Sequence, residues 1–341
     1  MRPRQRCSAA ICLCFRSACL RRDFGDTFAV HGKDEVNLLN TLQKWAAICD
    51  EMQESYPVLA TPFLAAEKRF GPRWVEEAVP AIEGMYGDIG NPLSDRLKDA
   101  LGCYAEFAND SMRHQVMFER SGKYRASNYE EVRTALYDNA DHMTQNYLPG
   151  LWFSHYVWPQ HYFTLIGFTN CVLPRIEDEG VFFEVGVGCG MYSKVTLDNK
   201  PGMRGIGFDI SQHSLDYTGR VMTSFGYESR YKLENRDIRH GYHVKADFLI
   251  CQEVLEHLEN PAEFCRWLFD MIRPGGQAFI TAALNAGHSD HIFLIRHPIE
   301  VEKMLTDAGF QITRIQEETA PGSKPRNLTP SLAGFLCVKP L

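Results

Sequence analysis

The feature that most constrains the fold is a pattern that begins after Gly180, in which short apolar runs alternate with stretches that have the apolar spacing of helices. Such alternation is typical of a parallel β-sheet whose strands are joined by crossover helices. The apolar spacing within residues 263–273 and 300–308 predicts two of these helices. The predicted strands are VFFEV (181–185), RGIGFDI (204–210), SRYKLEN (229–235), ADFLICQ (246–252), QAFITAA (277–283), FQITRIQEE (310–318) and AGFLCVK (333–339).

The last two predicted strands are joined by the segment TAPGSKPRNLTPS, residues 319–331. This segment is too short to contain a crossover helix, which a parallel pair of strands would require. We therefore expect the two strands to form an antiparallel hairpin at the edge of the sheet.

The first half of the chain has the apolar spacing of helices, with stripes at intervals of three and four residues, as in DEVNLLNTLQKWAAICDEM (34–52). A chain of 341 residues accommodates two domains. We predict an all-helical domain at 33–176, which caps the substrate pocket and offers a homodimer surface, and a cofactor-binding domain at 177–341. Aromatic and imidazole side chains near the end of the helical part either line the pocket or lie in the core: His155, Tyr156, His161 and Tyr162.

Residues 1–32 are basic and contain four of the eleven cysteines, at a spacing that matches no common zinc pattern. Arg16 interrupts the apolar core that a signal peptide needs, so we expect a disordered leader, with an organelle transit peptide as the alternative. No apolar run reaches the roughly 18 residues of a membrane span. We expect a cytoplasmic protein without a membrane partner, and the net charge of −7 argues against a nucleic-acid partner.

The first predicted strand of the sheet ends in an acid, Glu184, which is followed by Gly186, Gly188 and Gly190. The glycines permit a tight turn and a close approach of the backbone to a ligand. Asp209 ends the second strand, where a carboxylate can accept hydrogen bonds from both hydroxyls of a ribose. An acid before the first glycine would repel a pyrophosphate and suits a positively charged amino group.

The pattern E-V-G-x-G-x-G resembles the class I S-adenosylmethionine (SAM)-dependent methyltransferases, with an NAD-binding dehydrogenase as the alternative. DFLICQEVLEHLENP (247–261) and RPGG (273–276) are similar to the fourth-strand motif and the turn before strand five in ubiquinone-type and related small-molecule methyltransferases. This resemblance covers about 175–341. It implies an α/β fold with a Rossmann-like seven-stranded sheet, the last strand antiparallel, after an N-terminal all-helical domain.

The resemblance also implies that SAM is the cofactor and assigns each part of it to residues of this chain. The implied contacts are Glu184, Gly186 and Gly188 with the methionine part, Asp209 with the ribose, Asp237 and the backbone of Ile238 with the adenine, and Gln252 beside the sulfonium.

The acceptor pocket is expected where two histidine-bearing loops follow the strands, because ligands of open parallel sheets bind beyond the carboxyl ends of the strands. His257 follows the fourth strand, and His288 and His291 follow the fifth, with Asp290 between them. We predict His288 and His291 as catalytic residues. They serve either as a general base or, together with His257, as ligands of a divalent metal ion.

The nature of the acceptor decides what these histidines must do. An oxygen or nitrogen acceptor needs little beyond proximity and a proton acceptor, whereas a carbon next to a carbonyl needs a base and a stabilised enolate. The histidines and helical cap resemble α-keto acid C-methyltransferases of antibiotic and other small-molecule biosynthesis, of which the 2-ketoarginine enzyme is one. We expect methylation beta to the carboxylate of an α-keto acid. The alternatives are O- or N-methylation of a small aromatic or amine, and SAM binding without methyl transfer.

Overall fold

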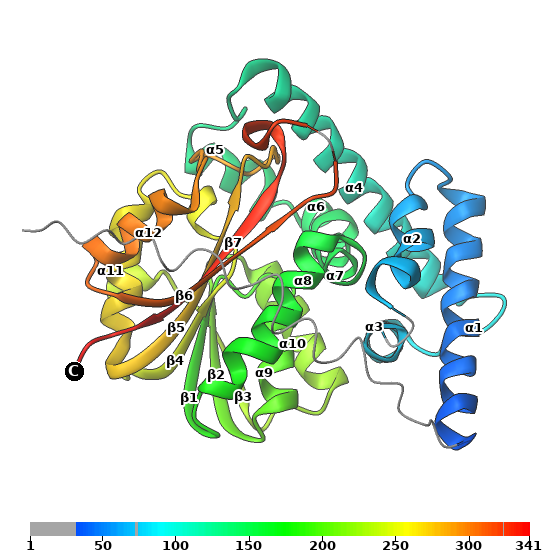
Figure 1. Ribbon diagram of the computed structural model, residues 1–341, viewed down its shortest axis with the longest axis horizontal. Helices are drawn as coiled ribbons and strands as arrows, with labels where there is room; N and C mark the ends of the chain where they lie inside the picture. Colours follow the sequence, from blue (N-terminus) through cyan, green and yellow to red (C-terminus); the bar gives the residue numbers. More distant parts are fainter. Residues whose placement is uncertain (1–31, 72–73, 323) are drawn as a thin grey trace, which may run out of the picture.

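The computed structural model describes residues 32–71, 74–322 and 324–341, which form one seven-stranded sheet with helices on both faces (Figure 1). The strand order is β3-β2-β1-β4-β5-β7-β6, and β1 to β5 are parallel. The leader predicted at residues 1–32 lies, apart from Gly32, outside the described residues. The strands are β1 Glu179–Val185, β2 Gly202–Asp209, β3 Tyr231–Asn235, β4 Ala246–Cys251, β5 Ile272–Leu284, β6 Gln311–Thr319 and β7 Ser331–Val338.

The predicted fold class is confirmed, including the antiparallel last strand. β7 inserts between β5 and β6 and is antiparallel to both, so that β6 forms the edge of the sheet. RPGG was predicted as the turn before the fifth strand, and this prediction is wrong because the segment lies inside β5. Ile272 already pairs with Ala246, and the register then shifts so that Gln277 pairs with Phe248. Such an irregularity accommodates a proline and two glycines within a strand.

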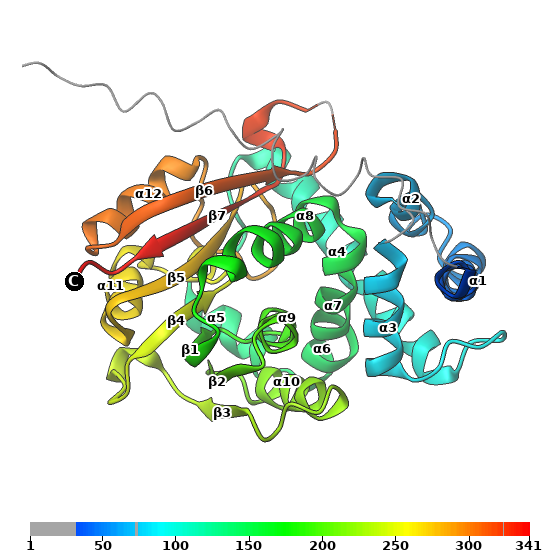
Figure 2. The same ribbon diagram turned by 60° about the horizontal axis from the view of Figure 1, so that its bottom comes forward.

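The helices that follow β1 lie in pairs on the two faces of the sheet (Figure 2), and α8 (Pro159–Gly167) of the N-terminal part packs against β6 and β7. Successive side chains of a strand point to opposite faces, so Phe182 packs on one side and Phe183 on the other. α9 Met191–Asn199 and α10 Gln212–Ser224 lie on the Phe182 side. The opposite face carries α11 Pro261–Met271 and α12 Pro298–Asp307.

The chain before β1 is helical, as predicted, and its core continues into the core beneath α9 and α10. The hydroxyls of Tyr86 and Tyr217 lie 2.7 Å apart across this junction. The boundary predicted between 176 and 177 stays a prediction, because both parts share this core. No helix of the described chain is long and apolar enough to span a membrane. The N-terminal helices are α1 Gly32–Ser55, α2 Thr61–Phe70, α3 Val75–Tyr86, α4 Asp95–Ser121, α5 Tyr129–Val132, α6 Ala140–His142, α7 Leu148–Val157 and α8 Pro159–Gly167.

Short irregular helices complete the framework, and two π-helical segments lie in the stretch that connects α5 to α7. Single π turns within helices are frequent at functional sites. The π segments are Arg133–Tyr137, Met143–Tyr147 and Phe168–Val172, and the 3-10 segments are Leu173–Arg175, Ile238–His240, Leu255–His257 and Arg326–Leu328.

Candidate active site

A cavity of about 840 Å³ lies beyond the carboxyl ends of the parallel strands, between the sheet and the N-terminal helices. Its walls come from the loops after β1 to β5 and from α4, α7 and α8. A volume of this size holds a ligand larger than a single small metabolite. The cavity lies where the sequence predicts the cofactor and the acceptor.

The glycine-rich turn after β1 forms one wall of this cavity and requires glycine. Gly186 and Gly188 have positive φ angles of 75° and 49°. A Cβ atom at Gly186 would lie 2.5 Å from Cγ2 of Val254. The turn therefore leaves bare backbone facing the cavity, as a cofactor-binding turn does.

Glu184 lies at the end of β1 and is almost fully buried. Its carboxylate accepts hydrogen bonds from the backbone N–H of Ser193, at 3.1 Å, and from the Ser193 hydroxyl. Burial raises the pKa of Glu184 to about 8. A neighbouring ammonium group would favour the ionised form. The predicted contact with the methionine part of SAM stays a prediction; the observed role is to tie β1 to the first turn of α9.

Asp209 ends β2 and lines the cavity beside the glycine-rich turn. Its carboxylate accepts hydrogen bonds from the backbone N–H groups of Ser211, at 2.8 Å, and Gly188, at 3.4 Å. Burial raises its pKa to about 6. The carboxylate is thus fixed in place by the backbone, in a position that suits the predicted ribose contact.

Asp237 and Ile238 line the cavity after β3, at the end predicted for the adenine. The two carboxylate oxygens of Asp237 accept hydrogen bonds from the backbone N–H and from Nε of Arg239, at 2.9 and 2.7 Å. Burial raises the pKa of Asp237, but the hydrogen bonds from Arg239 outweigh it and lower the pKa on balance. An adenine amino group at this carboxylate would share it with Arg239.

Gln252 follows β4 and has one engaged and one unengaged polar atom. Its Oε1 accepts a hydrogen bond of 3.1 Å from the Thr281 hydroxyl. Its Nε2 is buried and finds no partner within the described residues. A buried donor without an acceptor costs about 1–3 kcal/mol. Gln252 lines the cavity, so an acceptor on a bound ligand would satisfy this amide.

The structure brings His257, His288 and His291 together around the carboxylate of Asp290, whose side chain is 1% exposed. Nδ1 of His288 lies 2.5 Å from one oxygen of Asp290. Nδ1 of His257 lies 3.3 Å from the other oxygen, which also accepts a hydrogen bond of 3.1 Å from the Tyr137 hydroxyl. The loops after β4 and β5 thus meet, as predicted, and Asp290 is their common centre.

His288 and His291 differ in what their ring nitrogens contact. His288 lines the cavity, and its buried Nε2 has no partner in the described part of the chain. Burial lowers the pKa of His288, but the charge of Asp290 outweighs it and raises the pKa on balance. His291 Nδ1 donates to the carbonyl of Ala286 at 2.7 Å, and burial lowers the pKa of His291 to about 3. His291 is therefore a neutral imidazole.

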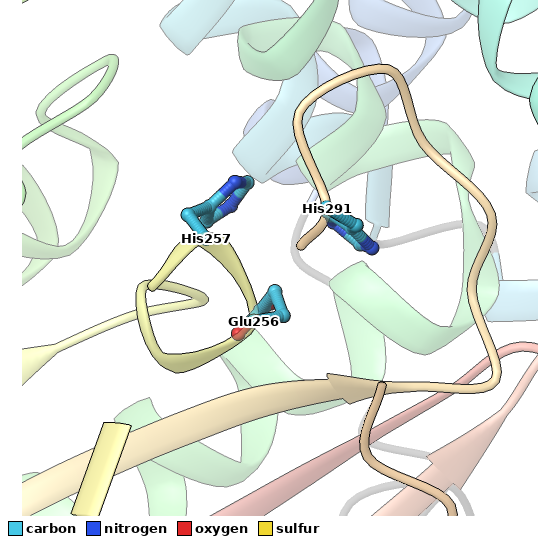
Figure 3. A group of neighbouring side chains, drawn as sticks. All are labelled: Glu256, His257 and His291. Atoms are coloured by element: carbon cyan, nitrogen blue, oxygen red, sulfur yellow. The ribbon is translucent and has the colours of Figure 1, made fainter. Parts of the chain in front are cut away.

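Among the described residues, two groups of three side chains could hold a metal ion. His291 belongs to both groups, whereas His257 and His288 fall in different ones. The first group joins His257 and His291 with Glu256 (Figure 3). Oε1 of Glu256 accepts a hydrogen bond of 2.9 Å from the backbone of Ala283, whereas its buried Oε2 has no partner among the described residues. The second group consists of His288, Asp290 and His291.

Comparison with known proteins identifies the chemistry. Residues 161–314 match a family described as "Methyltransferase domain". The ubiquinone biosynthesis O-methyltransferase of Dechloromonas aromatica (strain RCB) is 26% identical over 161 residues. The protein is a SAM-dependent methyltransferase. Its cofactor is SAM, and the bare glycine backbone, the fixed carboxylate of Asp209 and the unpaired amide of Gln252 fit this cofactor.

The similarity covers part of each protein. The alignment with the Dechloromonas relative spans 46% of this chain and 68% of the relative. The relative of the same description from Azoarcus sp. (strain BH72) is 26% identical over 33% of this chain and 47% of its own. Among solved structures, phosphoethanolamine N-methyltransferase 2 of Haemonchus contortus superposes with a TM-score of 0.49 at 12% identity, over 64% of this chain and 61% of that chain.

Sequence reasoning missed the aromatic wall of the methyltransferase's cavity. Phe107 of α4 and Tyr147 lie beside His288, with ring centroids 5.5 and 5.9 Å from its ring. Trp158 stacks on Phe107 at 5.3 Å, and its Nε1 donates a hydrogen bond of 3.0 Å to the Tyr104 hydroxyl. These residues belong to apolar helical stripes, which carry no sign of whether a side chain faces a core or a cavity.

Sequence reasoning also did not single out Glu253, which follows Gln252 and lines the cavity. Its φ angle is +49°, which is unusual for a residue with a side chain. The sequence leaves open whether four residues near the end of the helical part line the pocket or lie in the core. In the structure His155 and His161 line the cavity, whereas Tyr156 and Tyr162 pack in the core.

Proposed function

We propose that the methyltransferase transfers its methyl group to a hydroxyl of a small aromatic acceptor, with His288 as the general base. The observation that supports this most strongly is the buried, unpartnered Nε2 of His288, a residue that lines an aromatic cavity and whose Nδ1 is held by Asp290. This choice is one of the two alternatives to α-keto acid methylation that follow from the sequence.

The pairing of His288 with Asp290 suits proton removal. Because Nδ1 donates to the Asp290 carboxylate, the neutral ring carries its lone pair on Nε2, which has no protein partner among the described residues. The acceptor hydroxyl gives its proton to Nε2, and the negative charge of Asp290 stabilises the resulting imidazolium. SAM, when bound, supplies a methyl group activated by its sulfonium. The enclosing aromatic wall excludes water, which would otherwise compete for the proton.

The chemistry of the wall supports an uncharged aromatic ring as the acceptor. Phe107, Tyr147 and Trp158 offer ring faces on which an aromatic acceptor can stack. Among the described residues that line the cavity, the Lys and Arg side chains are Arg236 and Arg239, both at the predicted adenine end. An α-keto carboxylate would therefore lack a cationic side chain near His288. The name of the Dechloromonas relative, an O-methyltransferase, points in the same direction.

The test is incubation with labelled SAM and matched panels of phenols, catechols, amines and α-keto acids, with products identified by mass. We expect an O-methylated aromatic product. His288→Gln should lower kcat by about 10²- to 10⁴-fold, the usual contribution of a general base, without a change in S-adenosylhomocysteine affinity. His213→Gln, at a histidine outside this cavity, is the matched control. Full activity of His288→Gln would refute the assignment of the base.

A second candidate is the metal-assisted C-methylation of an α-keto acid, such as 2-ketoarginine. It is favoured by Glu256, His257 and His291, because two imidazoles and one carboxylate are a ligand set that divalent transition metals accept. A metal held there would neutralise the keto acid's carboxylate and stabilise its enolate. Metal analysis and removal by a chelator distinguish the candidates. Loss of activity on chelation, with α-keto acids as the methylated compounds, would replace the first proposal by the second.

A further inference from the structure

Glu253 is held in a strained backbone conformation at the wall of the cavity. Among the described residues, Glu253 and Asn285 are the non-glycine residues with positive φ, at 49° and 51°. The backbone N–H of Glu253 donates a hydrogen bond of 3.1 Å to the Thr281 hydroxyl, which fixes the strained turn. Strain of this kind persists where the surrounding structure imposes it, and such residues cluster at ligand sites.

Among the described residues, no Lys or Arg side chain lies within ion-pair distance of the Glu253 carboxylate, and the positive charge that lowers its pKa, against the larger effect of burial, is that of His288. Its ion-pair contact in the described structure is Nε2 of His161, at 4.0 Å. Burial lowers the pKa of His161 well below its usual value, so that this imidazole stays neutral. Arg236 and Arg239, the cations of the cavity wall, pair with acids elsewhere. A shielded carboxylate that has no cation in direct contact gains stability when a cation binds beside it.

The neighbouring histidine presents a second acceptor to the same space. The hydroxyl of Ser154 donates to the carbonyl of Leu151 at 2.7 Å, so its oxygen is left to accept from Nδ1–H of His161, at 2.9 Å. The proton of His161 is therefore on Nδ1, and Nε2 carries a lone pair. Two acceptors, Nε2 of His161 and the Glu253 carboxylate, thus lie 4.0 Å apart. A group with several N–H donors would satisfy both.

An aromatic ring completes the surroundings of this space. The ring of Trp158 lies 5.0 Å from that of His161. Trp158 also stacks on Phe107, whose ring in turn contacts that of His288. Trp is the side chain best suited to a cation–π contact. Carboxylate, imidazole lone pair and the neighbouring indole ring together offer what a primary ammonium group requires.

We propose that Glu253, His161 and Trp158 form a subsite for a protonated primary amine on the acceptor. The inference rests on the proposed function, because it assigns the amine to the cavity in which His288 deprotonates the hydroxyl. The acceptor class is then an aromatic hydroxyl compound with a short aminoalkyl chain. The same cationic chemistry is present in the sulfonium of SAM, so the experiment must distinguish the two sources.

The test is a charge series measured by calorimetry on the full chain saturated with S-adenosylhomocysteine. The three probes share a phenyl ring and differ in charge: phenethylamine, 2-phenylethanol and 3-phenylpropionate. We expect phenethylamine to bind about tenfold more tightly than the alcohol, and the carboxylate to bind most weakly. Glu253→Gln should abolish the preference for the amine. Glu263→Gln, at an exposed carboxylate of the same cavity, should retain it.

Equal binding of the three probes by the unmodified enzyme overturns the proposal. This measurement does not depend on whether any variant folds. A preference for the amine that survives in Glu253→Gln also overturns it. If Glu253→Gln instead lowers the affinity for SAM relative to S-adenosylhomocysteine and leaves amine binding unchanged, the carboxylate serves the sulfonium and the proposal is wrong. None of the probes carries an aromatic hydroxyl, so failure of catechols to be methylated would refute the proposed function and leave the subsite standing.

Discussion

The Asp209 carboxylate provides the sharpest test of the cofactor site. Two backbone N–H groups hold it at the end of β2, and it lines the cavity. Two ribose hydroxyls donating to an ionised carboxylate form charge-assisted hydrogen bonds, and Asp209→Asn removes the charge while it keeps the shape. The expected loss of S-adenosylhomocysteine affinity is about 1–3 kcal/mol, which corresponds to roughly 5- to 150-fold in Kd.

The pH dependence of S-adenosylhomocysteine affinity tests the role of Asp209 in a second, independent way. Burial raises the pKa of Asp209 to about 6, so the carboxylate of the free enzyme is largely protonated at pH 5 and largely ionised at pH 7. The amino group of S-adenosylhomocysteine stays protonated over this range. Affinity should therefore rise with pH between 5 and 7, by up to about tenfold, because the ionised form is the better acceptor. In Asp209→Asn this contribution should be lost, so that affinity changes less with pH than in the unmodified enzyme; the remaining dependence is that of Glu184, whose pKa burial raises to about 8.

Calorimetric titration of S-adenosylhomocysteine at pH 5, 6 and 7 measures both effects. Asp216→Asn, at an acid on α10 outside this cavity, is the matched control. An unchanged Kd for Asp209→Asn at pH 7, or the same pH dependence in the variant and in the unmodified enzyme, would show that Asp209 does not hold the ribose.

Three further predictions concern the turn, the base and the buried acid. Gly186→Ala should abolish S-adenosylhomocysteine binding, measured by calorimetry, because its Cβ would lie 2.5 Å from Val254 Cγ2 at a positive φ. Asp290→Asn should lower kcat about as much as His288→Gln and shift the pH–rate profile, since the imidazolium loses its partner. Burial raises the pKa of Glu184 from 4.5 to about 8, so the folded free enzyme retains a proton that the unfolded chain releases. The free energy of unfolding should fall, by about 4 kcal/mol, between pH 4.5 and 8, and Glu184→Gln should flatten this dependence in denaturant titrations.

The fold could be predicted from the sequence because its strongest signals are local. Among the parallel strands, β1, β2, β4 and β5 are short apolar runs followed by a helical stripe, and the short link between the last two strands excludes a crossover. The pattern predicts helices between all of the first five strands, and this is wrong between β3 and β4, where a 3-10 turn is the only helical element of the described chain. The position of β7 between β5 and β6 could not be predicted in this way, since a hairpin has the same sequence whichever of its strands joins the sheet. RPGG was misplaced for a related reason: a bulge in β5 depends on the neighbouring β4.

In the candidate site, too, the features that depend on local sequence could be predicted and those that depend on distant parts of the chain could not. Residues at strand ends, such as Asp209 and His288, could be located because strand order alone brings the carboxyl ends of parallel strands together. Asp290 could be noted as a neighbour of His288 in the sequence, but its role as the centre of three histidines depends on how two loops meet. Phe107 comes from a helix far earlier in the chain, and nothing in its apolar stripe distinguishes a cavity wall from a core.

Tyr137 shows what this long-range part of the structure adds. It ends a π-helical segment in the stretch between α5 and α7 and contacts both halves of the site. Its carbonyl accepts a hydrogen bond of 3.3 Å from the hydroxyl of Ser211, on the loop whose backbone holds Asp209. Its own hydroxyl donates to Asp290, which in turn holds His288. One residue from the helical part thus joins the cofactor loop to the proposed base. The helical part does more than cover the cavity, because without Tyr137 these two halves would lose this connection.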